Sequence, residues 1–133
     1  MPRAMSAPVA RSRSRSAARL AAVQALYQQE MEETPVARLL HEFHQHRLGA
    51  TIDGDEYADA EVDFFDDLVS GVHARREELD GLIAARLSKD WSLARLDRPM
   101  RQILRAGAYE LVARGDVATG TVISEYVDVA KAF

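Results

Sequence analysis

Apolar side chains recur every three or four positions in successive segments of this chain, and this spacing limits what the chain can fold into. Such a repeat places apolar side chains on one face of an α-helix, whereas a half-buried strand alternates at every second position. No segment alternates in that way, and no internal repeat of about 20 to 50 residues is visible. The sequence therefore predicts an all-α fold.

Turn and cap signals divide the pattern into about six helices. Proline is harmless in a first helical turn, where Pro35 and Pro99 are expected, and glycine favours a helix stop, as at Gly115. An acidic, solvated loop is expected over 49–59. The expected helices cover about 16–31, a segment from Thr34-Pro35 to near Gly49, 59–73, 75–87, a segment capped by Asp97, and a last segment capped by Thr119 or Thr121.

Length and composition predict one compact domain. The chain has 133 residues, of which 47% are hydrophobic and 7% aromatic, so Ala, Leu and Val would build a core of closely packed helices. The absence of cysteine excludes a disulfide framework, a thiolate metal site and a cysteine nucleophile, and it fits the cytoplasm. The sequence contains no run of about 18 apolar residues, so no membrane span is expected. The Arg- and Ser-rich start leaves a transit peptide as a weaker alternative.

Charge is distributed unevenly along the chain. Residues 1–29 carry five arginines and no acid, whereas the remainder carries a net charge of −9. The Ser/Arg tract cannot bury much apolar surface, so residues 1–15 are predicted to be a flexible basic arm ahead of a helical domain over residues 16–133. A basic arm on an acidic body favours a polyanionic partner and a basic protein partner.

Arg11, Arg15 and Arg19 stand four residues apart, so they would form one basic ridge if the first helix extended backwards on binding. Arg13 would widen the ridge, and Tyr27 lies two turns beyond Arg19. Arginine planes pair with phosphate and stack on bases, which favours RNA or DNA as the partner. We expect Arg15 and Arg19 to lie outside the apolar stripe. A disordered basic tail without a specific partner is the alternative.

Three other clusters are expected to be structural. Arg98, Arg101 and Arg105 form a second basic line, which is typical of a solvated face paired with acids, although it could extend an RNA path. Surface histidines are favoured over a zinc site at His41, His44 and His46, and a polar helix face is favoured for Glu61, Asp63, Asp66 and Asp67. No phosphate-binding loop or nucleophile motif is present, so no enzyme activity, metal or cofactor is expected.

Three stretches, taken in order, resemble the NusB family of transcription antitermination factors, and a fourth does so more weakly. They cover 19–27, 64–72 and 103–111, with the weaker one at 122–131. The resemblance implies a compact bundle of two packed helical sub-bundles. It also implies a factor that binds boxA RNA with NusE, a small-subunit ribosomal protein, and joins the elongating RNA polymerase on ribosomal RNA operons.

The resemblance also implies roles for individual residues. The Arg-rich amino end would face RNA, Glu110 would be structural, and the core would include Val23, Leu26, Ile103, Leu104 and Leu111. With the ridge and the second basic line, the expected RNA-binding residues are Arg11, Arg13, Arg15, Arg19, Tyr27 and Arg101.

The family pattern continues into a final helix, but the sequence given stops at Phe133. That helix would help to cover an apolar stripe comprising Ile123, Tyr126, Val127, Ala130 and Phe133. We therefore expect either a longer natural chain, which is favoured, or coverage by a partner or a homo-oligomer. Two other functions stay open: the NusB-like domain of an RNA methyltransferase, and a helical protein-interaction module.

Overall fold

The computed structural model describes residues 7–46 and 55–133, and all regular structure within these ranges is helical. None of the helices there is long and apolar enough to cross a membrane. Residues 49–54 of the expected acidic loop lie outside the described residues, whereas residues 55–59 are helical, so the expectation of a loop over 55–59 is wrong. The elements are α1 (Ala7–Glu32), α2 (Val36–His46), α3 (Asp55–Ala74), α4 (Arg76–Ala84), the short 3-10 helix η1 (Leu93–Arg95), α5 (Arg98–Ala113) and α6 (Thr119–Lys131).

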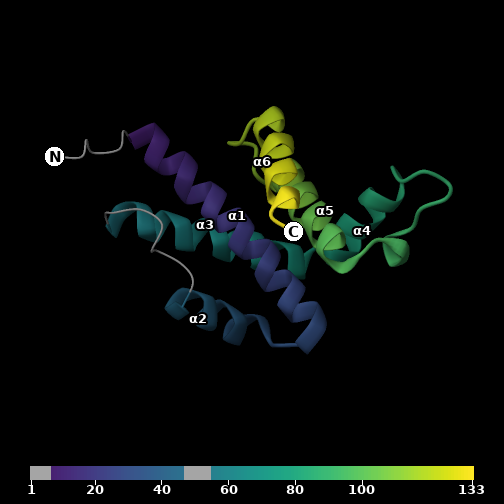
Figure 1. The fold of residues 1–133 in the computed structure, drawn as a ribbon, viewed down its shortest axis with the longest axis horizontal. Helices are drawn as coiled ribbons and strands as arrows, with labels where there is room; N and C mark the ends of the chain where they lie inside the picture. Colours follow the sequence, from purple (N-terminus) through teal and green to yellow (C-terminus); the bar gives the residue numbers. More distant parts are fainter. Residues whose placement is uncertain (1–6, 47–54) are drawn as a thin grey trace.

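The helices form two groups, as the resemblance implied. Helices α1, α2 and α3 pack together on one side, and α4, α5 and α6 pack together on the other (Figure 1). The groups meet where α5 contacts both α1 and α3. Helix α1 therefore belongs to the first group but also touches the second, because it contacts α6 as well.

Small side chains on α1 explain how it can contact four other helices. Ala18, Ala22 and Ala25 are completely buried, and alanine lets helix axes approach closely. Val23 and Leu26 are buried beside them, as predicted. Most of the contact surface of α1 lies against α3, which crosses it in Figure 1.

Helix α1 begins at Ala7, nine residues before the predicted start near Ser16. Tertiary contacts account for the earlier start, because Ser14 is buried and Ser16 donates a hydrogen bond to Glu125 of α6. The division into an arm at 1–15 and a domain at 16–133 stays a prediction.

The other helix ends follow the local signals to different degrees. The Asp97 carboxylate accepts a hydrogen bond from the Met100 amide at 2.9 Å, which confirms the predicted cap of α5. The predicted threonine cap of α6 is wrong: Ala118 is the cap residue and makes no side-chain bond, because Thr119 and Thr121 already lie inside the first turn.

Two predicted core positions on α5 differ from expectation. Ile103 is buried, but Leu104 is only partly buried and Leu111 is 49% exposed. Leu111 is exposed because it lines the open groove between α4, α5 and α6. Conversely, Tyr126 of the expected uncovered stripe is buried.

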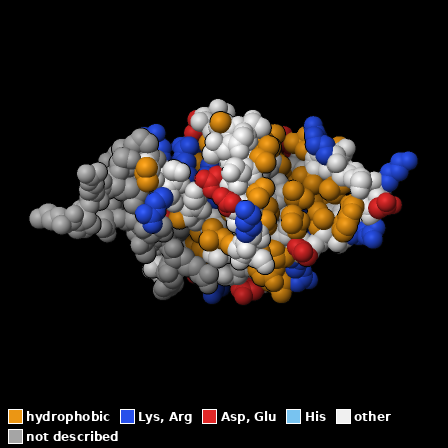
Figure 2. All heavy atoms as spheres, turned by 45° about the horizontal axis from the view of Figure 1, so that its top comes forward, with side chains coloured by type: hydrophobic (Ala, Val, Ile, Leu, Met, Phe, Trp, Pro, Cys, Tyr) orange, Lys and Arg blue, Asp and Glu red, His pale blue; other side chains and the backbone are white. Residues whose placement is uncertain are grey.

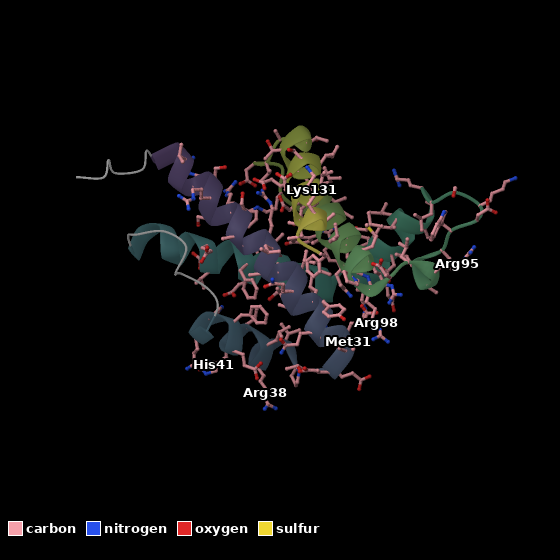
Figure 3. All side chains as sticks on the ribbon, in the orientation of Figure 1. Met31, Arg38, His41, Arg95, Arg98 and Lys131 are labelled. Atoms are coloured by element: carbon pink, nitrogen blue, oxygen red, sulfur yellow. The ribbon has the colours of Figure 1, made fainter. Side chains whose placement is uncertain are left out.

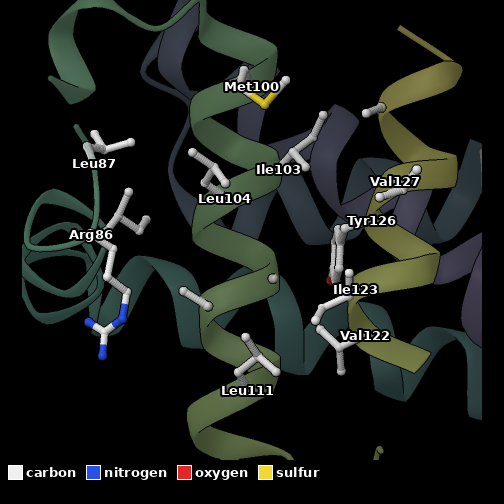
Figure 4. Close-up of a pocket in the computed structure, with 14 residues that line it drawn as sticks. Arg86, Leu87, Met100, Ile103, Leu104, Leu111, Val122, Ile123, Tyr126 and Val127 are labelled. Carbon is white, nitrogen blue, oxygen red and sulfur yellow. The ribbon is translucent and has the colours of Figure 1, made fainter. Parts of the chain in front are cut away.

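A groove with a volume of about 530 Å³ runs between α4, α5 and α6. Figure 2 shows hydrophobic side chains gathered over this half of the molecule, and Figure 4 shows α5 along the middle of the groove with α6 beside it. Within the expected stripe, Ile123 is 56% exposed and Val127 50% exposed. The structure thus confirms that part of the stripe is uncovered. The largest lining residues are Ile83, Arg86, Leu87, Met100, Ile103, Leu104, Leu111, Val122, Ile123, Tyr126 and Val127.

Candidate RNA interface

The arginine ridge of α1 runs from solvent into the protein interior. Arg11 and Arg13 are exposed, the Arg15 side chain is 29% exposed, and the Arg19 side chain is 2% exposed. Each step of four residues on a helix of 3.6 residues per turn rotates the side chain by about 40°, so the ridge turns gradually toward α5 and α6. The prediction that Arg19 lies outside the apolar stripe is therefore wrong.

Arg19 is buried together with the carboxylates that neutralise it. Its Nε and Nη2 atoms donate to the two oxygens of Glu110 at 2.7 and 3.1 Å, and Nη1 lies 3.2 Å from Glu125. Tyr126 donates to Glu110 at 2.7 Å, and Ser16 donates to Glu125 at 2.7 Å. A buried charge is tolerated when it is paired and hydrogen-bonded in this way. Glu110 is structural, as the resemblance implied.

Three arginines make cation–π contacts with the aromatic ring of Phe64, on α3. The guanidinium carbons of Arg15, Arg19 and Arg114 lie 4.9, 5.1 and 4.8 Å from the ring centroid. Each contact of this kind contributes about 0.5–1 kcal/mol at an exposed site and more when desolvated. Phe64 is itself buried, so it positions the base of the ridge relative to α3.

Arg114 joins the ridge to α3 and to the turn before α6. It donates to Asp67 at 3.1 Å and to both oxygens of Asp116 at 3.1 Å, while Arg15 donates to Asp116 at 3.2 Å. The hydrogen bonds from Arg114 lower the pKa of the Asp116 carboxyl. The Asp116 carboxyl therefore stays charged at neutral pH.

Two buried tyrosines stay protonated beside the same carboxylates. Burial and the hydrogen bond to Asp67 at 2.6 Å raise the pKa of Tyr109 to about 12. Burial and the negative charge of Glu110 raise the pKa of Tyr126 well above its usual value. Both hydroxyls thus act as fixed donors that hold carboxylates in place.

A pocket of about 230 Å³ lies where the ridge meets the start of α6. Arg11, Arg15 and Arg19 line it from α1, and Asp116 and Glu125 line it from the other side. Because two carboxylates face these three cations, the strongest net positive charge lies at the outer end of the ridge, where Arg11 and Arg13 face solvent.

In the second basic line, Arg101 and Arg105 are paired with acids, as the favoured interpretation predicted, whereas Arg98 has no carboxylate partner among the described residues. Arg101 pairs with Glu30, and Arg105 donates to Asp80 at 2.7 and 2.9 Å. Arg101 also donates to the backbone carbonyls of Leu93 and Leu96 at 3.0 and 3.1 Å. Its guanidinium therefore anchors η1.

The remaining predicted residues lie apart from the ridge. Tyr27 is partly buried on α1. His44 pairs with Asp66 across α2 and α3, and His41 is exposed, while the side chain of His46 lies outside the described residues. Among the residues that the structure describes, no three potential metal ligands gather.

The acids of α3 do not form a single polar face. Asp63 is exposed, but Glu61 is fully buried, and Asp67 bonds with Tyr109 and Arg114. Sequence reasoning missed the roles of Phe64 and Arg114. Phe64 stands in one of the stretches that carried the family resemblance, but no local pattern shows that an aromatic ring will receive cations from other helices.

The fold and site define a small all-α protein with an exposed arginine-rich helix end, supported by a buried ionic network. Residues 16–133 match the NusB family, and the chain therefore belongs to this family of transcription antitermination proteins. It is a non-catalytic factor, in agreement with the expectation from its sequence.

Similar proteins named transcription antitermination protein NusB occur in several bacteria. Those of Sphingopyxis alaskensis and Novosphingobium aromaticivorans are both 70% identical to this chain, over 92% and 91% of its length and 83% and 82% of theirs. That of Sinorhizobium fredii is 48% identical over 95% of this chain and 79% of its own length.

Two solved structures have a similar fold. NusB of T. maritima has a TM-score of 0.73 with 28% identity, and the match covers 90% of this chain and 78% of that chain. A chain in the crystal structure of a plectonemic RNA supercoil has a TM-score of 0.75 with 28% identity, covering 90% of this chain and 81% of that chain. These matches agree with the two helical groups described above.

Proposed function

We propose that this chain binds boxA-like RNA through the amino-terminal part of α1, acts together with NusE, and joins the elongating RNA polymerase to support ribosomal RNA transcription in the cytoplasm. The observation that carries the proposal is the exposure of Arg11 and Arg13 on a helix whose next turns are fixed by buried ion pairs. A rigid helix presents arginines to phosphates and bases with little loss of entropy on binding.

The ridge residues then divide by role. Arg11, Arg13 and Arg15 contact RNA, with Arg15 held beside Asp116 until it does so. Arg19 does not contact RNA itself but positions the other ridge arginines, because its pairing with Glu110 fixes α1 against α5. Arg101 acts in the same indirect way through η1. Tyr27 lies further along α1, where it is only partly buried, and we assign it to base stacking.

Fluorescence anisotropy with labelled boxA RNA and a scrambled RNA tests the RNA contact. Arg11→Ala with Arg13→Ala should weaken boxA binding and lower the salt slope by about 0.7 for each lost phosphate contact. Arg38→Ala is the matched control, because Arg38 is an exposed arginine on α2. Circular dichroism should show equal helix content in all variants. Unchanged affinity in the double variant would remove the arm from the interface.

The same titration with and without NusE tests the partner. The chain beyond residue 29 has a net charge of −9, which suits a basic ribosomal protein. We expect tighter boxA binding when NusE is present. Equal affinities in the two series would contradict cooperative assembly.

No observation favours the methyltransferase alternative. The relatives named above are antitermination proteins, and this chain covers about four fifths of their length.

A further inference from the structure

The connection between α4 and α5 carries an exposed aromatic residue at a distance from the arginine arm. Trp91 is the only tryptophan in the chain, and it is 51% exposed. Figure 3 shows Arg95, which follows Trp91 in this region, at the end of the molecule opposite the start of α1, and Arg98 beside Met31 near the end of α1. This connection takes no part in the buried network beneath the ridge.

Trp91 is held in place although it faces solvent. The Arg95 guanidinium lies 5.5 Å from the centroid of the Trp91 ring and also donates to the backbone carbonyl of Asp90. Arg101 fixes the following residues through the carbonyls of Leu93 and Leu96, and its own charge is balanced by Glu30. The ring and the guanidinium thus form a preorganised surface, which we name the Trp91 platform.

Cations without a described acidic partner flank Trp91 in the sequence. Among the residues that the structure describes, no carboxylate pairs with Arg86, Lys89, Arg95 or Arg98. Arg86 donates to the Leu82 carbonyl, and Arg98 donates to the Met31 sulfur. Residues 86–98 contain these four cations and only two acids, Asp90 and Asp97, and Asp97 is used as the cap of α5. The segment is therefore locally basic in a chain with a net charge of −4.

We propose that the Trp91 platform is a second contact for single-stranded RNA, separate from the arm. Every base can stack on an exposed aromatic ring, and neighbouring cations neutralise the phosphates that flank it. Four cations lie within seven positions of Trp91 in the sequence, and none has a carboxylate partner among the described residues, so they are available to phosphates, which favours RNA over a protein partner. This inference rests on the proposed function in RNA binding.

The two contacts are far enough apart to be tested separately. Helix α1 has 26 residues and is therefore about 39 Å long. The exposed arginines of the arm lie near its start, and Arg95 of the platform lies beyond its other end (Figure 3). A stacked strand advances about 3.4 Å per nucleotide, so roughly 12 nucleotides are needed to connect them. An RNA of about 8 nucleotides can occupy the arm alone, whereas one of about 24 nucleotides can reach both contacts.

Because Trp91 is the only tryptophan, its fluorescence reports directly on the platform. We would titrate the chain with two RNAs of about 8 and 24 nucleotides that share one boxA core, with free tryptophan amide in parallel to correct for absorbance. The longer RNA should quench Trp91 and bind more tightly. The shorter RNA should bind without quenching.

Variants then separate the platform from the arm. Trp91→Leu should weaken binding of the longer RNA by roughly tenfold, as expected for the loss of one stacked base, and leave the shorter RNA unaffected. Lys89→Ala with Arg98→Ala should lower the salt slope for the longer RNA only. Arg38→Ala should change neither.

The outcomes distinguish failure of the Trp91 platform from failure of the proposed RNA binding. If both RNAs bind but Trp91 fluorescence and the Trp91→Leu affinity do not change, the platform is not an RNA contact and a protein partner becomes the explanation for its exposure. If neither RNA binds, the proposed function itself fails, and this inference fails with it.

Discussion

Arg19 and Arg13 differ in exposure although they are the same residue type on the same helix. Arg13 faces solvent, whereas Arg19 is buried against Glu110 and Glu125 and lies over the ring of Phe64. Desolvation of a charge costs several kcal/mol, and the two carboxylates offset that cost only while both sides of the pair are present. A mutation at this position therefore acts first on stability and only then on RNA binding.

Arg19→Ala should lower the free energy of unfolding by about 3–5 kcal/mol, because it leaves the Glu110 carboxylate buried without its bidentate partner. Arg13→Ala, the matched control on the exposed side of α1, should change it by less than about 0.5 kcal/mol. Urea denaturation followed by circular dichroism measures both. Equal stability of the two variants would show that the buried pair does not hold α1 in place.

Tyr109 should make stability depend on pH in the alkaline range. Its pKa is about 12 in the folded chain and 10 when unperturbed, so its contribution is fully present below pH 10 and is lost as pH rises toward 12. Wild-type stability should therefore fall more steeply between about pH 10 and pH 12 than that of Tyr109→Phe. Urea denaturation at several pH values checks this. Parallel curves for the two proteins would contradict it.

At the scale of elements, the packing of α5 on α3 depends on one close approach. A Cβ atom on Gly71 of α3 would lie 2.1 Å from the ring of Tyr109, so no other residue fits while that ring stays in place. The ring cannot move freely, because its hydroxyl is bonded to Asp67. Gly71 is therefore required by its contact with a neighbouring helix and not by its backbone angles.

Gly71→Ala should destabilise the chain by about 1–3 kcal/mol through overpacking and loss of the hydrogen bond from Tyr109 to Asp67. Gly81→Ala, on α4, is the control, because open space surrounds Gly81. That variant should stabilise the chain by about 0.5–1 kcal/mol through helix propensity. Thermal and urea unfolding measure the difference. Two changes of the same sign would contradict the packing argument.

At the scale of the whole molecule, the group formed by α4, α5 and α6 is less completely covered than the group formed by α1, α2 and α3. Its helices leave the groove of about 530 Å³ lined by apolar side chains (Figure 4). The stripe on α6 divides accordingly, with Tyr126 buried and Ile123 and Val127 about half exposed. Coverage of the groove by a longer chain, a partner or a second copy stays a prediction.

The 133-residue chain should bind a fluorescent apolar dye such as ANS in its native state. Ile123→Ser with Val127→Ser should weaken dye binding but change the free energy of unfolding by less than about 1 kcal/mol, since both side chains are about half exposed. Val129→Ser, on the buried side of the same helix, should cost about 1–3 kcal/mol. Dye binding that appears only on dilution would show that a second copy covers the groove. No dye binding at any concentration would contradict an open groove.

Helix content and most helix limits could be predicted from the sequence because their causes are local. Apolar spacing within one segment determines whether a helix can bury a face, and the cap of α5 by Asp97 depends on residues three positions apart. The positions of the arginines along α1 are local in the same sense. These features required no knowledge of other helices.

The tertiary structure alone decided which of these residues are exposed. Arg19 is buried because Glu110 and Glu125, about 90 and 100 positions away, arrive on α5 and α6. Leu111 has the spacing of a core residue but is exposed, because no described helix covers its side of α5. Side-chain spacing defines the faces of a helix, but which face is buried depends on where distant segments dock, and that information is spread over the whole chain.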